Sequence, residues 1–507
     1  MSDLDKYQTV VLENRPELAG ILREFGQQKL SYFVKLHQQK LTVSSVNHNT
    51  ERNPAPKANT RQHLSTDKNQ WPSGARVTKT IPPNPNLPSE RKNELIGVIV
   101  DITNKLLGGT VVEQIKNYLT QNYSVSTADH HGPISHPFFW QAHLARAALG
   151  QKVHLVLATS NVSLNNSSLP RSLIFHNQNL VEERLHFFSL KNRHQPVWCT
   201  EAYKIDVIQN ITKQINQSKI TSTQKVFLQN LINKVYANAK ALNAKSYADQ
   251  IAITNYLLWQ NLPNCADNAM VYLEMEQIAS ELIQKFHLNS PTIINQLIFS
   301  EVGQKLYAKN YEGISGAFTN NPPHGSFLFW AIQNQTRLAL TLKNDHLINE
   351  VVGYKIKLDP KIVSDKLKSR ELIPTTALSL SIISFYYGLT CGGGFSQVDY
   401  LTSMKRAFLI CASELNNKAD NLLIKDTTTN YLAASFAFLY LNNNLASSID
   451  WLLYQKPEVI ELLQQNLNQI TLNQAFQTLL PEFYHIITGK FVASGYITNI
   501  NPILHLT

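Results

Sequence analysis

Hydrophobic residues follow a helical period through much of this chain. In PELAGILREFGQQKLSYFVKLHQQ, residues 16–39, apolar side chains recur at spacings of three and four, which is typical of amphipathic helices. The same spacing predicts a helix that starts near Ser89 and is broken at Gly108 and Gly109, with a second helix directly after it. The N-terminal part of the chain is therefore expected to be largely helical.

Two later segments have a different pattern. Residues 152–190 predict two or three strands, because β-branched and apolar residues alternate around a turn rich in Asn and Ser. Residues 325–358 predict a hairpin, whose apolar runs flank QNQ, and one further strand. The remaining chain after about residue 202 again has a mostly helical pattern. We expect an α+β fold with a helix-rich body and a small mixed sheet, in which these two segments lie close together.

The length and the proline distribution suggest a division into parts. A chain of 507 residues exceeds what one hydrophobic core usually serves. Residues 51–93 contain seven prolines and few aliphatic side chains, too few to offset the entropy of ordering the chain. We expect an N-terminal helical segment (1–42), a flexible, basic, Pro-rich connector (43–93), an α+β domain (94–360) and a C-terminal helical domain (361–507).

The charge of the chain gives little support to a nucleic-acid partner. Half of the net charge of +10 comes from residues 51–93, where eight Lys and Arg residues face three Asp and Glu residues. The remainder is spread thinly, so no basic stripe on an ordered helix is expected. No apolar run is long enough to span a membrane, no secretory signal is visible, and the four cysteines are far apart. These features favour a cytoplasmic protein without a membrane partner.

Histidines cluster in STADHHGPISHPFFWQAHLARAALG, residues 126–150. Asp129, His130, His131 and His136 lie within eight residues, and eight of the 16 histidines fall between positions 130 and 194. Imidazole is suited both to metal ligation and to proton transfer near neutral pH. Glycine and proline in this stretch exclude a helix and predict a tight loop, after which Pro137 begins a helix with Ser135 or His136 as its cap.

Three interpretations of this loop remain open. In the first, His130, His131 and His136 bind a divalent metal such as zinc, although their spacing matches no known zinc signature. In the second, His131 acts as general acid or base, and Asp129 orients its ring. In the third, the rings only cap the following helix and bond to loop carbonyls. A functional site is favoured, and the helix start beside it would attract an anionic group.

The segment TSNVSLNNSSLPRSLIFH and a turn near residue 324 supply candidate substrate-binding residues. Arg171 is suited to a carboxylate or phosphate, and the amides before it offer hydrogen bonds, although a solvated turn would have the same composition. The full set of candidates is Asn161, Asn165, Asn166, Arg171, His324 and Ser326.

A glycine triplet, Gly392–Gly394, precedes another predicted helix start near Ser396 but lacks the spacing and lysine of a phosphate-binding loop. Taken together, the patterns favour an enzyme, a hydrolase or lyase, that acts on a small polar and anionic substrate. The alternatives are a group-transfer enzyme that binds a phosphorylated donor, and a non-catalytic interaction protein that uses the basic arm.

Overall fold

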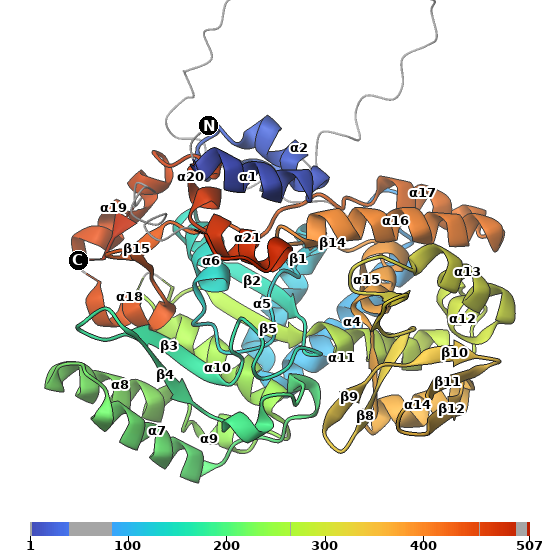
Figure 1. Ribbon diagram of the computed structural model, residues 1–507, viewed down its shortest axis with the longest axis horizontal. Coiled ribbons are helices and arrows are strands. Elements are labelled where there is room, and N and C mark those ends of the chain that lie inside the picture. The colour runs from blue at the N-terminus through green and yellow to red at the C-terminus, as the bar shows by residue number, and fades with distance from the viewer. Residues whose placement is uncertain (1–2, 40–83, 264, 456, 493–503, 507) are drawn as a thin grey trace, which may run out of the picture.

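The computed structural model describes residues 3–39, 84–492 except 264 and 456, and 504–506. Helices predominate and several small sheets accompany them, so the predicted α+β class is confirmed (Figure 1). Residues 43–83 of the predicted flexible connector lie outside the described residues, and its last residues, from Ser89, belong to a helix. No helix in the described part of the chain is both long and apolar enough to cross a membrane.

A four-stranded parallel sheet forms the centre of the molecule. Its strands, in spatial order, are β14 (Thr390–Gly392), β1 (Ser124–Ser126), β2 (Val153–Ala158) and β5 (Ala269–Glu274). The sequences VHLVLA and AMVYLE are almost continuously apolar, as parallel strands covered on both faces usually are. The start of MVYLEMEQIASEL had a helical pattern, but its first residues belong to β5, and the helix begins only at Met275.

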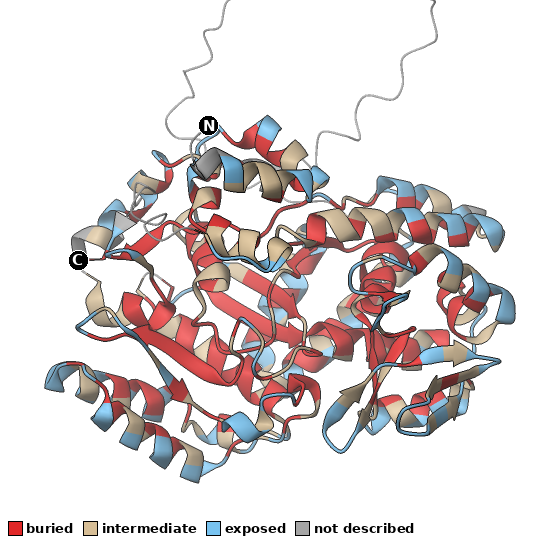
Figure 2. Cartoon of the chain, viewed as in Figure 1, coloured by how far each residue is buried: buried red, intermediate tan, exposed pale blue. Residues whose placement is uncertain are grey.

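Helices cover both faces of this sheet, so its strands are almost entirely buried (Figure 2). Val156 and Tyr272 point to one face, while Leu155 and Val271 point to the other, in two separate hydrophobic clusters. The first face packs against α6 (Pro137–Ala148) and α10 (Tyr247–Asn261). The second packs against α4 (Ser89–Leu106), α5 (Gly109–Gln121) and α11 (Met275–Leu282).

A hairpin and a helical group extend the molecule beside α10. The hairpin consists of β3 (Ser172–His176) and β4 (Glu182–His186), and the helices are α7 (Ile205–Gln217), α8 (Ser222–Val235) and α9 (Ala239–Leu242). The predicted strands of residues 152–190 are therefore present as β2, β3 and β4. They do not form one unit, since β2 belongs to the parallel sheet whereas β3 and β4 pair with each other.

Residues 293–374 form a second lobe, on the right in Figure 1. Its elements are α12 (Ile293–Phe299), α13 (Glu301–Tyr311), β6 (Phe318–Asn320), β7 (Pro323–Gly325), β8 (Phe329–Gln333), β9 (Thr336–Leu338), β10 (Thr341–Lys343), β11 (His346–Asn349), β12 (Tyr354–Lys357), α14 (Pro360–Lys368) and β13 (Leu372–Pro374). The predicted hairpin is β8–β9, which turns at Asn334 and Gln335. We expected these strands to share a sheet with residues 152–190, and this was wrong, because β8 pairs with β13 and β9.

The C-terminal part is interwoven with the rest and forms no separate helical domain. β13 pairs with β8, and β14 pairs with β1 in the central sheet. Two sheets therefore contain strands from both sides of the domain boundary that was expected at residue 360. The elements that follow β13 are α15 (Thr376–Leu380), α16 (Gln397–Glu414), α17 (Lys418–Asp426), β15 (Leu439–Leu441), β16 (Asn444–Leu445), α18 (Ser448–Tyr454), α19 (Pro457–Leu467), α20 (Leu472–Gln477), α21 (Leu480–Thr488) and β17 (Leu504–His505).

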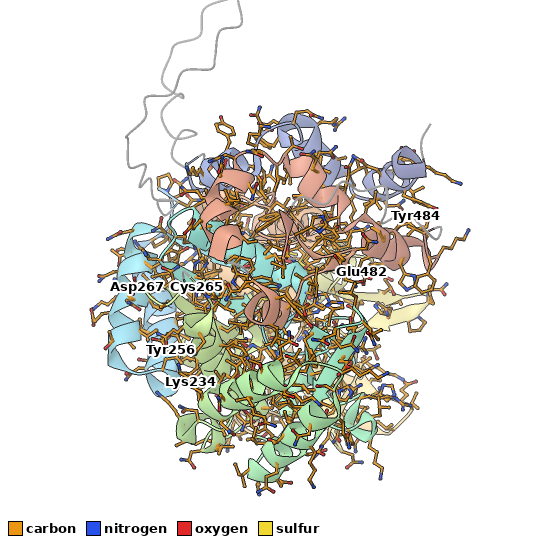
Figure 3. All side chains as sticks on the ribbon, turned by 90° about the vertical axis from the view of Figure 1, so that its left-hand side faces the viewer. Lys234, Tyr256, Cys265, Asp267, Glu482 and Tyr484 are labelled. Atoms are coloured by element: carbon orange, nitrogen blue, oxygen red, sulfur yellow. The ribbon has the colours of Figure 1, made fainter. Side chains whose placement is uncertain are left out.

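The two ends of the chain pack together. The N-terminal helices are α1 (Asp3–Glu13), α2 (Pro16–Phe25) and α3 (Leu30–Gln39), as the helical pattern predicted. The rings of Tyr7 on α1 and Tyr484 on α21 lie 4.7 Å apart, and Figure 3 shows Tyr484 beside Glu482 on the same helix. The backbone of Glu17 on α2 donates to Asp399 on α16 at 2.9 Å. These contacts hold α21 over the carboxyl edge of the central sheet (Figure 1).

Candidate functional site

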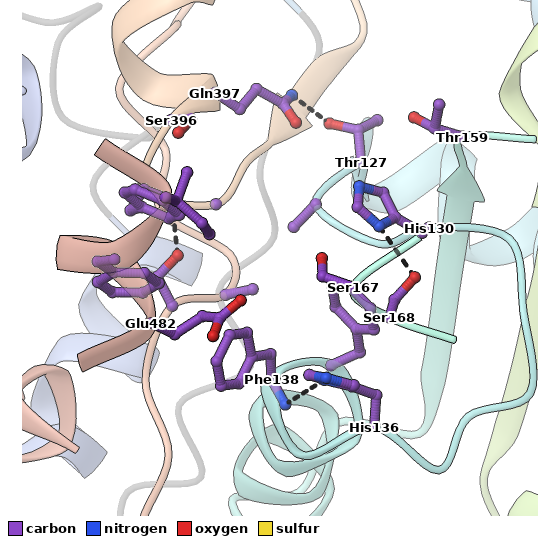
Figure 4. A pocket seen from close by; sticks show the side chains of 18 of the residues that line it. Thr127, His130, His136, Phe138, Thr159, Ser167, Ser168, Ser396, Gln397 and Glu482 are labelled. Carbon is purple, nitrogen blue, oxygen red and sulfur yellow. Dashed lines mark hydrogen bonds between the residues drawn. The ribbon is translucent and has the colours of Figure 1, made fainter. Parts of the chain in front are cut away.

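A cavity of about 250 Å³ lies where strands β1, β2 and β14 end. Parallel strands present their carboxyl ends at one edge of a sheet, and ligands bind there where neighbouring connections diverge. The connections diverge in this way at β1. The chain that leaves β1 continues to β2 on one side, whereas β14 lies on the other side of β1. The loops after both strands line the cavity, together with α6 and α21 (Figure 4).

The loop after β1 carries the histidine cluster and is held in an extended form against the end of β2. The backbone of His131 donates to the Thr159 carbonyl at 2.9 Å, and Thr159 donates to the Asp129 carbonyl at 3.0 Å. Successive side chains of an extended segment point to opposite sides. His130 therefore lines the cavity, whereas Asp129 and His131 point into the core.

Asp129 forms a buried hydrogen-bond cluster behind the cavity. Its carboxylate accepts from His143 Nε2 at 3.0 Å and from the Tyr272 hydroxyl at 2.5 Å, and it lies 3.4 Å from the Ser126 hydroxyl. Burial acts to raise the pKa of Asp129, but His143 and Tyr272 outweigh burial and hold this pKa below its usual value. Asp129 thus orients His143 and not His131, which corrects the role expected from the sequence.

His131 is fully buried and does not line the cavity. Its Nε2 lies 2.9 Å from the Ala248 carbonyl, so this nitrogen carries the proton, and its Nδ1 has no partner among the described residues. Burial lowers the pKa of His131. A side chain enclosed in this way has no access to substrate, and the structure gives no support to His131 as general acid or base.

The predicted metal ligands are not brought together. His130 and His136 both line the cavity, but His131 points away from it. His136 Nδ1 instead accepts from the backbone of Phe138 at 3.4 Å and caps α6, as the helix-start pattern predicted. Within the described ranges, no three His, Cys, Asp or Glu side chains are grouped so that they could hold a metal ion.

Most of the predicted substrate-binding residues also lie elsewhere. Arg171 is buried in the β3–β4 hairpin, where its Nη1 contacts His186 Nδ1 at 3.1 Å and donates to the Phe188 carbonyl at 3.2 Å. Asn161 joins the two lobes, because its carbonyl accepts from Arg337 at 2.6 Å and its amide donates to the Thr376 hydroxyl at 3.3 Å. Neither residue lines the cavity.

His324 and Ser326 belong to the second lobe. His324 is exposed on β7 and lines a separate cavity of about 450 Å³. The Ser326 hydroxyl accepts from the Leu340 backbone at 2.8 Å and donates to the Phe329 carbonyl, so it holds the turn that leads into β8. His324 was a candidate for the same site as the histidine loop, but His324 and His130 line different cavities.

His130 is the histidine whose position suits proton transfer in the cavity. Its Nδ1 lies 3.0 Å from the Ser168 hydroxyl, and that hydroxyl lies 3.1 Å from Asn166 Oδ1. The backbone of Ser168 also donates to Asn166 Oδ1 at 3.2 Å, which identifies this atom as the amide oxygen. Because an amide oxygen can only accept, Ser168 donates to Asn166, and His130 Nδ1–H donates to Ser168.

This order of donors leaves the other nitrogen of His130, Nε2, without a proton. Figure 4 shows that the ring nitrogen not bonded to Ser168 faces the open space of the pocket. Burial lowers the pKa of His130, although Asp129 and Asn166 act in the opposite direction. The ring is therefore neutral at pH 7 and presents a basic nitrogen to the cavity. Of the predicted amide cluster, Asn166 supports this ring from behind, and Asn165 is exposed to solvent.

The glycine triplet brings the opposite wall of the cavity close to the sheet. A Cβ on Gly392 would lie 2.6 Å from Ala433 Cβ, and one on Gly393 would lie 2.6 Å from Gln397 Cβ. Only glycine permits these approaches. Gln397, at the start of α16, donates to the Thr127 hydroxyl at 2.5 Å across the ends of β14 and β1. The triplet was noticed in the sequence, but its place beside the histidine loop was not predicted.

Most of the cavity wall was not predicted from the sequence. Hydroxyl groups and one amide line the side near the strand ends, and aromatic rings line the side formed by α6 and α21. The missed residues that matter most are Thr127, Thr159, Phe138, Phe395, Gln397, Ser435, Glu482 and Phe483. No local pattern marks them, because they come from five segments that only the tertiary fold assembles.

No protein-family model matches this chain, and no curated protein matches it in sequence.

Proposed function

We propose that this chain is an enzyme that acts on a small polar substrate in the cavity at the carboxyl edge of the parallel sheet. His130 is the general base, and Ser168 and Asn166 orient it. The observation that carries the proposal is the chain of hydrogen bonds from Asn166 through Ser168 to His130 Nδ1, which directs the free Nε2 at the cavity.

The environment of His130 suits a base that works near neutral pH. A lowered pKa keeps the imidazole unprotonated at pH 7, so it can accept a proton. Its ring lies 5.6 Å from the ring of Phe139, so one side is shielded from water. Thr127 and Thr159 line the cavity beside it. The Thr127 hydroxyl already donates to the Gly392 carbonyl and accepts from Gln397, so the Thr159 hydroxyl is the one that can donate to a polar substrate.

The reaction class that fits is a hydrolysis or an elimination. His130 Nε2 takes a proton from a water molecule or from a substrate carbon, and the resulting imidazolium returns this proton to the leaving group. The base transfers the proton within one site, so no external oxidant or reductant is needed. A positioned base of this kind contributes about 10²–10⁴-fold to a rate.

The proposal can be tested without knowledge of the substrate. Thermal-shift screening of small polar compounds against the full chain would first identify ligands. Ser167→Trp places a large side chain at the exposed wall of the cavity and should abolish these shifts. Asn165→Trp is the matched control, because Asn165 is exposed on the same loop but does not line the cavity.

Turnover of each ligand would then be followed by proton NMR. We expect His130→Gln to bind the ligand with similar affinity and to convert it about 10²–10⁴-fold more slowly. Ser168→Ala should show a smaller loss, because it removes the orienting partner and leaves the base. Ligands that bind in the cavity but are converted by wild type and His130→Gln at the same rate would overturn the proposal.

A further inference from the structure

We infer that the ligand of this cavity carries a positive charge and is a small organic ammonium compound. The inference rests on the proposed function, since it names the substrate class of the same site. An anionic substrate was expected because of Arg171, but Arg171 lies in the β3–β4 hairpin outside the cavity. A cationic ligand therefore takes the place of that expectation.

The ionic side chains that line the cavity have one sign. Among the described residues that line it there is no Lys or Arg, and Glu482 is the one Asp or Glu. Two imidazoles, His130 and His136, also line it. Burial lowers the pKa of both, that of His136 to about 4, so neither ring is cationic at pH 7. The formal charge of the lining at neutral pH is therefore negative.

Two nearby arginines do not themselves line the cavity. Arg15 donates through Nη1 to the Asn14 carbonyl at 2.7 Å, its Nε lies 3.4 Å from the Ser396 hydroxyl at the rim, and its guanidinium lies over the Phe395 ring, 5.7 Å from the ring centroid. Arg184, which helps to lower the pKa of His136, pairs with Glu182 at 2.6 Å. An anion in the cavity would thus find no guanidinium among the residues that line it.

Glu482 is placed to receive a cation. It lies in the first turn of α21, and its carboxylate points into the space opposite Ser167 and His130 (Figure 4). In the part of the chain that the structure describes, this carboxylate has neither an ion-pair nor a hydrogen-bond partner. A partly buried carboxylate beside apolar rings gains most from a ligand that supplies the missing charge.

Aromatic side chains line the part of the cavity that α6 and α21 form, where Glu482 also lies. The rings of Phe395 and Phe483 stack with centroids 3.8 Å apart, and the rings of Phe138 and Phe483 lie 6.1 Å apart at 65°. All three residues line the cavity. Ring faces attract cations, and several rings around one point are the usual means of binding ammonium groups.

The two halves of the cavity therefore select different parts of one molecule. The ammonium group lies between Glu482 and the phenylalanine rings. The polar, reactive end extends across the cavity toward Thr127 and His130, where the base lies. A small amine or quaternary ammonium compound with a hydroxyl, ester or carbonyl group at its other end meets both requirements.

The test compares two probes of the same shape, choline and its uncharged carbon isostere 3,3-dimethylbutan-1-ol. Binding to the full chain is measured by saturation-transfer NMR and calorimetry, so turnover is not required. We expect saturable choline binding at least tenfold tighter than that of the isostere, and tenfold corresponds to about 1.4 kcal/mol. Equal or tighter binding of the isostere, a lack of saturable choline binding, or displacement of choline by inorganic phosphate at the same site would overturn the inference.

Matched variants assign the preference to Glu482. Glu482→Gln keeps the shape and removes the charge, and it should lose the preference for choline while it still binds the isostere. Glu461→Gln, on the exposed surface of α19 and outside the cavity, should behave as wild type. An unchanged preference in Glu482→Gln would also refute the inference. Thermal unfolding of both variants confirms that they are folded.

This experiment separates the inference from the proposed function. Choline binding that depends on Glu482, without any His130-dependent turnover of ammonium compounds, would support the ligand class and count against the chemistry. His130-dependent turnover of an uncharged or anionic compound, together with a lack of choline binding, would support the chemistry and refute the ligand class.

Discussion

Replacement of Asp129 by alanine tests whether this residue supports the core or takes part in catalysis. The carboxylate is 1% exposed and accepts from two buried donors, His143 Nε2 and the Tyr272 hydroxyl. Asp129→Ala would leave both donors without an acceptor in a region closed to water. We therefore expect a large loss of stability, whatever its effect on any reaction.

The size of this loss follows from the number of contacts removed. An unsatisfied buried donor costs about 1–3 kcal/mol. With two donors affected, we expect the free energy of unfolding to fall by about 2–6 kcal/mol. Asp129→Asn keeps the volume and one acceptor oxygen, so its loss should lie between those of the wild type and the alanine variant.

Urea denaturation followed by tryptophan fluorescence measures this change. The control is Asp267→Ala, because Asp267 is an exposed carboxylate shortly before β5, and its removal should change stability by less than about 0.5 kcal/mol. If Asp129→Ala and Asp267→Ala denatured at the same urea concentration, the buried cluster would contribute nothing and the reasoning would be refuted.

The stability conferred by Asp129 should also depend on pH in a defined direction. Its pKa in the folded protein is lower than in the unfolded chain, so folding favours the ionised carboxylate. The contribution is fully present above the unfolded pKa of about 3.9 and is lost as the pH falls through the folded pKa. The difference between wild type and Asp129→Asn should therefore be constant at neutral pH and shrink below about pH 4.

Two further changes test other parts of the structure. Gly393→Ala would bring a methyl group against Gln397 and displace the hydrogen bond from Gln397 to Thr127. We expect the free energy of unfolding, measured by urea denaturation, to fall by about 1–3 kcal/mol and ligand binding in the cavity to weaken. Unchanged binding and stability would contradict the close approach. Glu276 is buried below Ser160, and burial raises its pKa to about 7. Since the folded protein then binds the proton more tightly than the unfolded chain, stability should fall by up to about 3 kcal/mol as the pH rises from about 4.5 to 7. Glu276→Gln should remove this pH dependence. Parallel pH profiles of stability for the two proteins would contradict the prediction.

Local signals in the sequence predicted the parts of the fold that depend on neighbouring residues. The cap and start of α6 at His136 and Pro137, the break at Gly108, and the turn at Asn334 all follow from the conformational preferences of a few adjacent residues. The strand β5 was missed, because the sequence from Ala269 continues without a break into a helix and its apolar residues fit either period.

The candidate site was predicted only in its location along the chain. The histidine loop does line the cavity, but the direction of each side chain depends on the pairing of this loop with Thr159, which only the folded sheet provides. This pairing separates His130 from Asp129 and His131, so the expected roles were assigned to the wrong neighbours. Glu482 could not be associated with His130, because more than 350 positions separate them.

The parallel pairing of β1 with β14 has a consequence for synthesis of the chain. Ser126 pairs with Gly392, 266 positions later. At about 5–20 residues per second, a ribosome needs roughly 13–53 s to reach the second strand after it has made the first. During this interval β1 has an unpaired edge of the kind that associates with other chains. A nascent chain that stops before residue 390 should therefore aggregate. Binding of a chaperone to this edge would be greatest after β1 has been made and before β14 has been made.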